Sequence, residues 1–478
     1  MAVNLAKNTF YLTLAAVGQK ILAFIYFMMI ARIVGVENTG VYFFALSFTT
    51  IFSIFVDFGL NPVLIREIAK DKDKIVKFLN NIFSVKLILA VSTAIAAIVL
   101  GKLLGYSELK MLMIYLALFV MIADSFHLTF YGVFRGLRIL NYEALGIFIS
   151  EVLIVGLGIG ILILHPSLPL LIIALLSGSI FHLIYTLILL KKKVKTLPRW
   201  EFDIPFIKST FKIALPFALA GVSVKVYSYI DSVLLERLAG DIYVGWYSIA
   251  YKFTYAFQFI PMAFVAGLYP VLAKHWKENH DKLASTFEQA MRYMMVISVP
   301  ICFGIWSLAD NIVLTFYGQD YFNSILPLQI LIFVLFAIFV DFPVGSLLNA
   351  CDRQATKTGI MIVTMLINVI LNAILIPKYD VVGASIAGLV SFSFMLLAGL
   401  YYGKKVVNFN IANLLLNTAR TVISGALMAA VVIILKPYLH FAFIIPIGAF
   451  VYVGALYLVR GWRKEDIFTL RQLLLKKS

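Results

Sequence analysis

The chain has 478 residues, of which 62% are hydrophobic and only 13% are charged, and its mean hydropathy is +0.98. Soluble globular domains carry about 25% charged residues, so this composition excludes that class and indicates a polytopic membrane protein. The formal net charge of +16 does not indicate nucleic-acid binding. The basic residues lie in short loops between apolar runs and form no recognisable nucleic-acid-binding module.

Apolar runs long enough to cross a bilayer follow one another along the whole sequence. A spanning helix needs about 20 apolar residues, and cutting the sequence at clusters of charge, proline and glycine predicts about fourteen such helices. They fall near residues 8–33, 39–64, 78–101, 109–134, 142–164, 167–190, 208–236, 243–273, 284–309, 321–350, 356–377, 381–403, 411–435 and 439–460. The predicted fold class is therefore an all-α polytopic membrane protein.

Most of the 40 lysines and arginines lie in loops on the side that faces the N-terminus. By the positive-inside rule, this bias predicts that both termini are cytoplasmic and that the chain is a multi-pass protein of the cell membrane. We expect the basic end of the sequence to form a short amphipathic helix on the membrane surface.

The two halves of the sequence resemble each other. ARIVGVENTGVY at 31–42 matches ERLAGDIYVGWY at 236–247, and GLNPVL at 59–64 matches GLYPVL at 267–272. Six predicted spans separate the two repeat units, so both halves enter the membrane in the same sense. This pattern predicts two pseudo-symmetric six-helix lobes, followed by two further helices.

The repeat and the span limits together predict five parts. They are an N-terminal lobe at 1–190, a cytoplasmic linker at 191–207, a C-terminal lobe at 208–406, the last two spans at 407–460 and the amphipathic tail at 461–478.

Three lysines, Lys20, Lys225 and Lys252, lie well inside predicted spans, where a charge costs about 2.5–3.5 kcal/mol on insertion scales. Lys225 is related to Lys20 by the offset of 205 that relates the first pair of repeats. We expect these two ammonium groups to face each other across a gap between the lobes and to bind an anion there, with Lys252 in the same cavity. The alternative is that each lysine reaches a lipid headgroup or pairs with an acid.

Acidic residues inside the spans are candidates for ion coupling or for structural pairing, and they include Asp124, Glu151, Asp231 and Asp341. Glu151 is the strongest candidate for a proton or sodium site, although pairing with a lysine is equally open. Asp231 follows Lys225 by six residues and lies on another helical face, so we expect it to pair with another helix. Asp57 and Asp341 lie close to glycine or proline, and we expect them to satisfy freed backbone groups or helix ends.

The sequence contains no motif for nucleotide binding, hydrolysis or metal binding. His127, His182, Cys302 and Cys351 are isolated, and we expect all four to be core residues. We therefore predict no enzymatic activity, no cofactor and no metal site. Energy would come from a Na⁺ or H⁺ gradient, from the membrane potential or from the gradient of the substrate itself. The short outer loops argue against a membrane-embedded glycosyl transferase, which is the alternative from another class.

Four segments resemble the polysaccharide flippases of the multidrug/oligosaccharidyl-lipid/polysaccharide exporter superfamily. They are DFGLNPVLIREIAK (57–70), GVFRGLRILNYEALG (132–146), YIDSVLLERLAGDIYVGWYSIAYK (229–252) and GSLLNACDRQ (345–354). The resemblance covers nearly the whole chain. It implies fourteen helices and the flipping of a lipid-linked oligosaccharide across the cytoplasmic membrane by alternating access. Such lipids carry phosphate or diphosphate, which suits a cavity with lysines.

Two other branches of the superfamily are also similar. Multidrug exporters commonly use an acidic residue in the first helix to couple ions to cationic drugs, whereas this chain has Lys20 there. Lipid II flippases use cavity arginines where this chain has lysines. As partners we expect the lipid-linked glycan, membrane lipids and glycan polymerase or transferase machinery, with a monomer as the functional unit.

Overall fold

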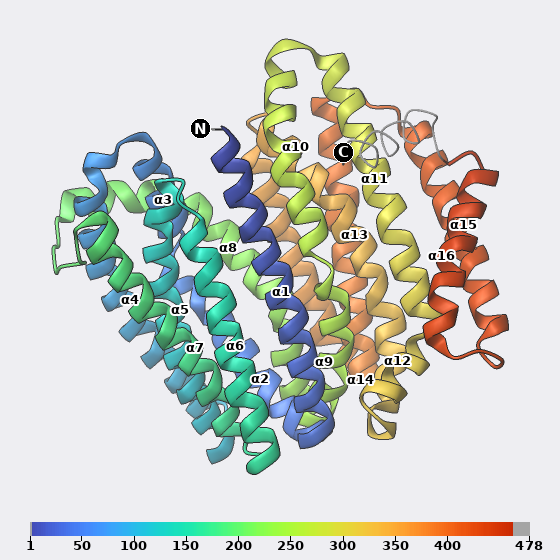
Figure 1. Cartoon of the computed structure of the whole chain (residues 1–478), viewed down its shortest axis with the longest axis horizontal. Helices are drawn as coiled ribbons and strands as arrows, with labels where there is room; N and C mark the ends of the chain where they lie inside the picture. Colours follow the sequence, from blue (N-terminus) through green and yellow to red (C-terminus); the bar gives the residue numbers. More distant parts are fainter. Residues whose placement is uncertain (1, 462–478) are drawn as a thin grey trace. The chain divides into compact units, whose positions relative to one another are not determined.

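A computed structural model describes the backbone of residues 2–461 and the side chains of residues 14–461 (Figure 1). The described part of the chain is helical and contains no strand. The predicted amphipathic tail lies outside the described residues, apart from its first residue, Gly461.

The helices follow one another with short connections, as Figure 1 shows. They are α1 (Ala2–Val34), α2 (Val36–Asp57), α3 (Leu60–Lys70), α4 (Ile75–Leu103), α5 (Glu108–Gly136), α6 (Asn141–Leu164), α7 (Leu168–Leu189), α8 (Ile204–Leu238), α9 (Asp241–Ala256), α10 (Phe259–Glu278), α11 (His280–Ser307), α12 (Ala309–Phe316), α13 (Ile325–Ala350), α14 (Gln354–Val406), α15 (Ile411–Leu435) and α16 (Phe441–Leu458).

The described residues contain 13 segments that are long and apolar enough to cross a membrane. One of them, α14, has 53 residues and breaks at Asp380, where φ is 47° and ψ is −128°. Its two parts match the predicted spans 356–377 and 381–403. The all-α polytopic fold predicted from the sequence is therefore confirmed.

Two predicted spans differ from the observed helices, because each is broken within the apolar run. The run 39–64 breaks at Phe58 and Gly59, which both adopt left-handed backbone angles between α2 and α3. A Cβ on Gly59 would lie 2.7 Å from the carbonyl oxygen of Ala214 in α8, so only glycine fits at this break. The run 243–273 breaks between α9 and α10.

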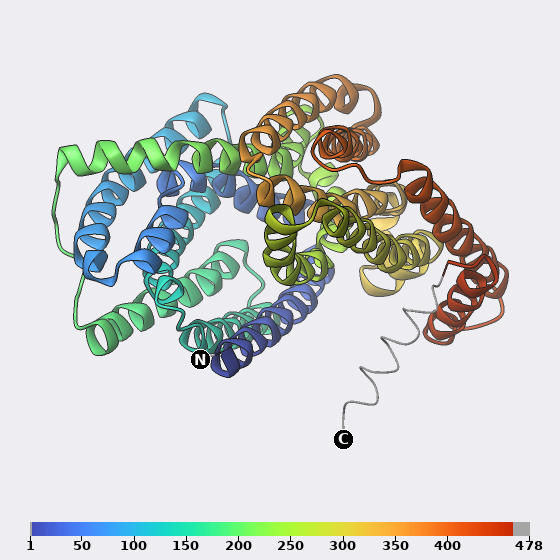
Figure 2. The same cartoon turned by 90° about the horizontal axis from the view of Figure 1, so that it is seen from above.

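The chain forms two compact units. The first takes in the chain up to Ser248 together with Met361–Ala387, and the second takes in Ile249–Ile360 and the chain from Gly388 onward. Within the first unit, α1 packs on α6, α5 on α7 and α2 on α8. Within the second, α11 packs on α13 and α15, and α15 lies beside α16, as the dark red helices of Figure 2 show.

The repeated sequence forms a reciprocal contact inside the first unit. A Cβ on Gly40 of α2 would lie 1.9 Å from the carbonyl oxygen of Asp241, and a Cβ on Gly245 of α9 would lie 2.2 Å from the carbonyl oxygen of Val36. Gly40 and Gly245 are equivalent in the repeat, and so are Val36 and Asp241, because each pair is separated by 205 residues. The two helix starts therefore contact each other backbone to backbone about a pseudo-two-fold axis.

Replacing Gly40 or Gly245 with alanine should lower the melting temperature of the purified protein. The new methyl group would overlap a backbone carbonyl, and overpacking of this kind costs about 1–3 kcal/mol or more. Gly156→Ala in α6 is the matched control, because no atom lies within 4 Å of its added Cβ. Equal melting temperatures for Gly40→Ala and Gly156→Ala would contradict the contact.

Candidate functional site

Lys225 lies partly buried in α8. Its Nζ is 5.8 Å from the centroid of the Tyr229 ring, one helical turn further along. Asp57 of α2 and Asp124 of α5 are near enough to attract the ammonium group electrostatically. Both acids have closer partners, since Asp57 forms an ion pair with Lys86 and Asp124 contacts a histidine. Lys225 is therefore held by an aromatic ring, with its positive charge only partly compensated by distant carboxylates.

Lys86 of α4 is fully buried and is bound on three sides. Its Nζ lies 3.0 Å from Asp57 Oδ1, 3.0 Å from the carbonyl oxygen of Ser125 and 2.6 Å from Thr129 Oγ1. These contacts tie α4 to α2 and α5 and satisfy the three donors of the ammonium group. The expectation that Asp57 satisfies backbone groups is wrong, because its carboxylate binds this side chain. Lys86 is a structural residue.

Two stacked histidines form a second buried cluster on α5, α6 and α7. The rings of His127 and His182 are nearly parallel, at an angle of 16°, with centroids 4.5 Å apart. His182 contacts Tyr131 Oη at 3.0 Å through Nδ1 and Ser150 Oγ at 2.7 Å through Nε2. His127 Nε2 lies 3.1 Å from Asp124 Oδ1. The expectation of a satisfied core histidine is confirmed for His182, and Asp124 is paired with His127.

Asp231 of α8 lies in a buried polar cluster. Its carboxylate accepts hydrogen bonds from Tyr247 Oη at 2.7 Å and from Asn372 Nδ2 at 2.6 Å. Asn368, one turn before Asn372 on α14, lies beside the same carboxylate. The expected pairing of Asp231 with other helices is therefore confirmed.

The amide oxygens in this cluster are free to accept hydrogen bonds or to bind a cation. Oδ1 of Asn368 and Oδ1 of Asn372 are both buried and accept no hydrogen bond within the described part of the chain. Nδ2 of Asn368 is likewise buried without a hydrogen-bond partner among the described residues, and because buried polar atoms normally have a partner, these three atoms need an explanation. Carboxylate and amide oxygens are the ligands that hard cations prefer.

The candidates Lys20, Glu151 and Lys252 lie on three different helices. Lys20 is exposed on α1. Glu151 is buried in α6, where it interacts electrostatically with Tyr26 and Tyr42. Lys252 of α9 is partly buried and belongs to the second compact unit. A shared anion site of Lys20, Lys225 and Lys252 stays a prediction.

Asp341 of α13 pairs with a lysine that the sequence analysis did not single out. Nζ of Lys357, near the start of α14, lies 2.9 Å from Oδ1 and 2.7 Å from Oδ2 of Asp341. The expectation that Asp341 satisfies freed backbone groups is therefore wrong, while its classification as a structurally paired acid is supported. The sequence signal for this pair was the charge of Lys357, which lies at the edge of a predicted span.

A family comparison decides what kind of protein this is. The sequence profile of the family described as "Polysaccharide biosynthesis protein" matches residues 5–276, which is more than half of the 478 residues. The chain belongs to this family. The profile of a second family, MatE, matches residues 216–374.

Relatives in this family and one solved structure extend the comparison. The chain is 24% identical over 395 residues to "Probable low-salt glycan biosynthesis flippase Agl15" of Haloferax volcanii. The aligned region covers 82% of this chain and 81% of the relative. It is 24% identical to "Capsular polysaccharide biosynthesis protein CapF" of Staphylococcus aureus, covering 84% of this chain and 100% of the relative. The structure "Lipid II flippase MurJ, inward closed conformation" superposes with a TM-score of 0.76 at 15% identity over 96% of this chain and 99% of that chain. This last likeness shows the shared polytopic fold.

Replacing Lys86 with methionine should destabilise the protein strongly. Asp57 would keep a partly buried charge without its partner, and breaking a buried ion pair costs about 3–5 kcal/mol. Denaturation followed by tryptophan fluorescence in detergent measures the loss. The double variant Lys86→Met with Asp57→Asn should recover part of it.

The control for this experiment is Lys102→Met, at the exposed end of α4. Its stability should match that of the natural sequence. Strictly additive losses in the double variant would contradict the pairing.

Proposed function

We propose that this chain is a flippase that moves an anionic lipid-linked oligosaccharide or polysaccharide repeat unit across the cytoplasmic membrane by alternating access. Membership of the polysaccharide biosynthesis family supports this function, and so does the name of the relative Agl15, a probable glycan biosynthesis flippase. The polytopic fold provides the helices that such transport needs.

The observation that carries the proposal is that Lys225, unlike several other lysines in or near the spans, forms no salt bridge with a carboxylate within the described part of the chain. Lys86 inside α4, and Lys110 and Lys357 near the starts of α5 and α14, are each in salt-bridge contact with a carboxylate. Lys225 instead contacts the face of Tyr229, and its charge attracts Asp57 and Asp124 only at longer range. A charge kept in the membrane without a close counter-ion marks a functional site, and a phosphate or diphosphate would complete it.

The MatE match supports a second candidate, a cation-coupled antiporter of small molecules or drugs. The two candidates require opposite charges at the binding site, because cationic drugs need an acidic partner and lipid phosphates a basic one. Lys20 and Lys225 favour the lipid phosphate. Cells that lack the protein should accumulate lipid-linked glycan and keep their resistance to cationic dyes.

We further propose that a monovalent cation drives the cycle and that it binds at Asp231. The carboxylate of Asp231 is buried together with the side-chain amides of Asn368 and Asn372, whose oxygens accept no hydrogen bond within the described residues, and oxygen ligands of this kind suit a hard cation. Asp231 and Lys225 lie on the same helix, so an ion on α8 would act on the helix that carries the substrate lysine. Glu151 is the second candidate for this role.

The proposed setting follows from the same features. The chain would lie in the cell membrane with both termini in the cytoplasm, would act as a monomer without catalysis, and would receive its substrate from glycan transferases or pass it to a polymerase.

Lys225→Ala and Lys20→Ala should each slow the flipping of a lipid-linked oligosaccharide in reconstituted vesicles by about tenfold or more, since a hydrogen bond to a charged group contributes about 1.5–3 kcal/mol. Lys212→Ala, at an exposed position near the start of α8, should leave the rate unchanged. Normal flipping by the Lys20/Lys225 double variant would exclude the cationic cavity.

Asp231→Asn should abolish stabilisation by sodium. We expect the melting temperature of the natural protein to rise when NaCl replaces choline chloride, because an ion that binds only the folded state stabilises it. The rise should disappear in Asp231→Asn and persist in Asp124→Asn, whose carboxylate pairs with His127. An equal rise in both variants would rule out Asp231 as the ligand.

A further inference from the structure

The linker between α7 and α8 ends in an extended segment that is bound across α4. We call this segment, residues 195–203, the strap. Every second residue donates its backbone N–H to a side chain of that helix: Arg199 to Asn80 Oδ1 at 3.0 Å, Glu201 to Ser84 Oγ at 2.8 Å and Asp203 to Asn81 Oδ1 at 2.8 Å. The acceptors lie on one face of α4, because their spacing follows the helical period.

Both acidic side chains of the strap form contacts with side chains of α4. Asn80 and Asn81 each donate an amide hydrogen bond to the carboxylate of Glu201, at 3.0 Å and 3.1 Å. Asp203 pairs with Lys77 at 3.0 Å and accepts a hydrogen bond from the N–H of Phe206, and these two contacts hold its pKa below the usual range. Asp203 is therefore paired with a cation, and the carboxylate of Glu201 is held towards α4 by two amides.

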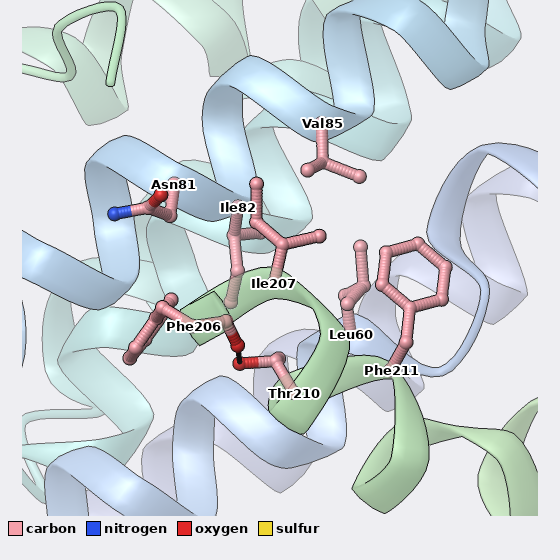
Figure 3. A pocket seen from close by; sticks show the side chains of 8 residues that line it. All are labelled: Leu60, Asn81, Ile82, Val85, Phe206, Ile207, Thr210 and Phe211. Carbon is pink, nitrogen blue, oxygen red and sulfur yellow. Dashed lines mark hydrogen bonds between the residues drawn. The ribbon is translucent and has the colours of Figure 1, made fainter. Parts of the chain in front are cut away.

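The first turns of α8 continue the attachment. Phe206 packs edge-to-face on Phe78 of α4, with centroids 4.7 Å apart. Figure 3 shows the apolar groove that follows, in which Ile207 and Phe211 of α8 meet Leu60 of α3 and residues of α4. The strap is thus fixed at its far end by packing as well as by hydrogen bonds.

The opposite edge of the strap is aromatic and exposed. A period of two residues turns Trp200 and Phe202 away from the residues that donate to α4. Their side chains are 63% and 44% exposed, and their rings stack at 12° with centroids 6.2 Å apart. Ile204, the first residue of α8, is 55% exposed.

The exposed charged residues of the linker are all positive. The segment from the end of α7 to the strap carries the exposed residues Lys191, Lys192, Lys193, Lys195 and Arg199. Because Glu201 and Asp203 are bound to α4, the charged side chains of this segment that remain for a ligand are those of the four lysines and Arg199. The lysines precede the two aromatic residues in the chain, and the same alternation places Arg199 on the edge towards α4. Figures 1 and 2 both show this connection at the outer edge of the first unit.

We propose that the strap is a preformed binding site for anionic phospholipid headgroups, with Trp200 and Phe202 in the interfacial layer of the bilayer. Aromatic rings favour the headgroup level of a membrane, and each nearby lysine or arginine adds attraction to an anionic leaflet. The strap joins two membrane spans, so the bilayer surface is within its reach. The site is independent of transport and of the residues proposed to bind substrate.

The test uses the purified full-length protein in nanodiscs of phosphatidylcholine, with or without phosphatidylglycerol. The emission of Trp200 is obtained by subtracting the spectrum of Trp200→Phe, or of Trp200→Tyr if the first variant does not fold. Lipids brominated near the headgroup should quench this emission, and phosphatidylglycerol should increase the quenching several-fold.

Replacing Lys191, Lys192, Lys193 and Lys195 with glutamine should remove the effect of phosphatidylglycerol. The matched control replaces Lys274, Lys277 and Lys282, at the connection between α10 and α11, and should keep it. A Trp200 emission that aqueous iodide quenches and brominated lipid does not would overturn the proposal and indicate a soluble partner. An unchanged phosphatidylglycerol effect in the linker variant would overturn the role of the lysines.

Discussion

The close backbone contact between the starts of α2 and α9 is the constraint on which the first unit depends. Gly40 and Gly245 each accommodate a carbonyl group of the other helix, so neither position can carry a side chain without moving a backbone. Gly35 and Gly240, which precede the same two helices, both adopt positive φ values. Both halves of the sequence therefore have glycine at these positions because they share the same geometric requirement.

Charged side chains inside the spans serve two different purposes. The ion pairs of Lys86 with Asp57 and of Lys357 with Asp341 join helices within each unit and leave little charge available to a ligand. Lys225 and Asp231, both on α8, have aromatic or amide partners instead. A charge with polarizable or neutral neighbours can exchange one counter-ion for another, which an ion pair buried between helices cannot do.

The all-α polytopic fold was predictable, because hydropathy depends on short stretches of sequence. The partners of the buried charges were not. Asp57 binds a lysine 29 residues further along, and Asp231 binds an asparagine 141 residues away. The packing of the helices determines which residues meet across such separations in the sequence. Polar residues within apolar runs, such as Asn80, Asn81, Ser84, Asn368 and Asn372, were the available signal, and each of them lies in one of the hydrogen-bonded clusters or beside it.

The contacts of Lys86 have a consequence for how the protein is made. Its partners lie on α2, which precedes it in synthesis, and on α5, which follows it. An isolated α4 in lipid would hold an ammonium group that costs about 2.5–3.5 kcal/mol to insert. We therefore expect α2, α4 and α5 to enter the bilayer as a group, with α4 retained by the insertion machinery until α5 has been synthesised.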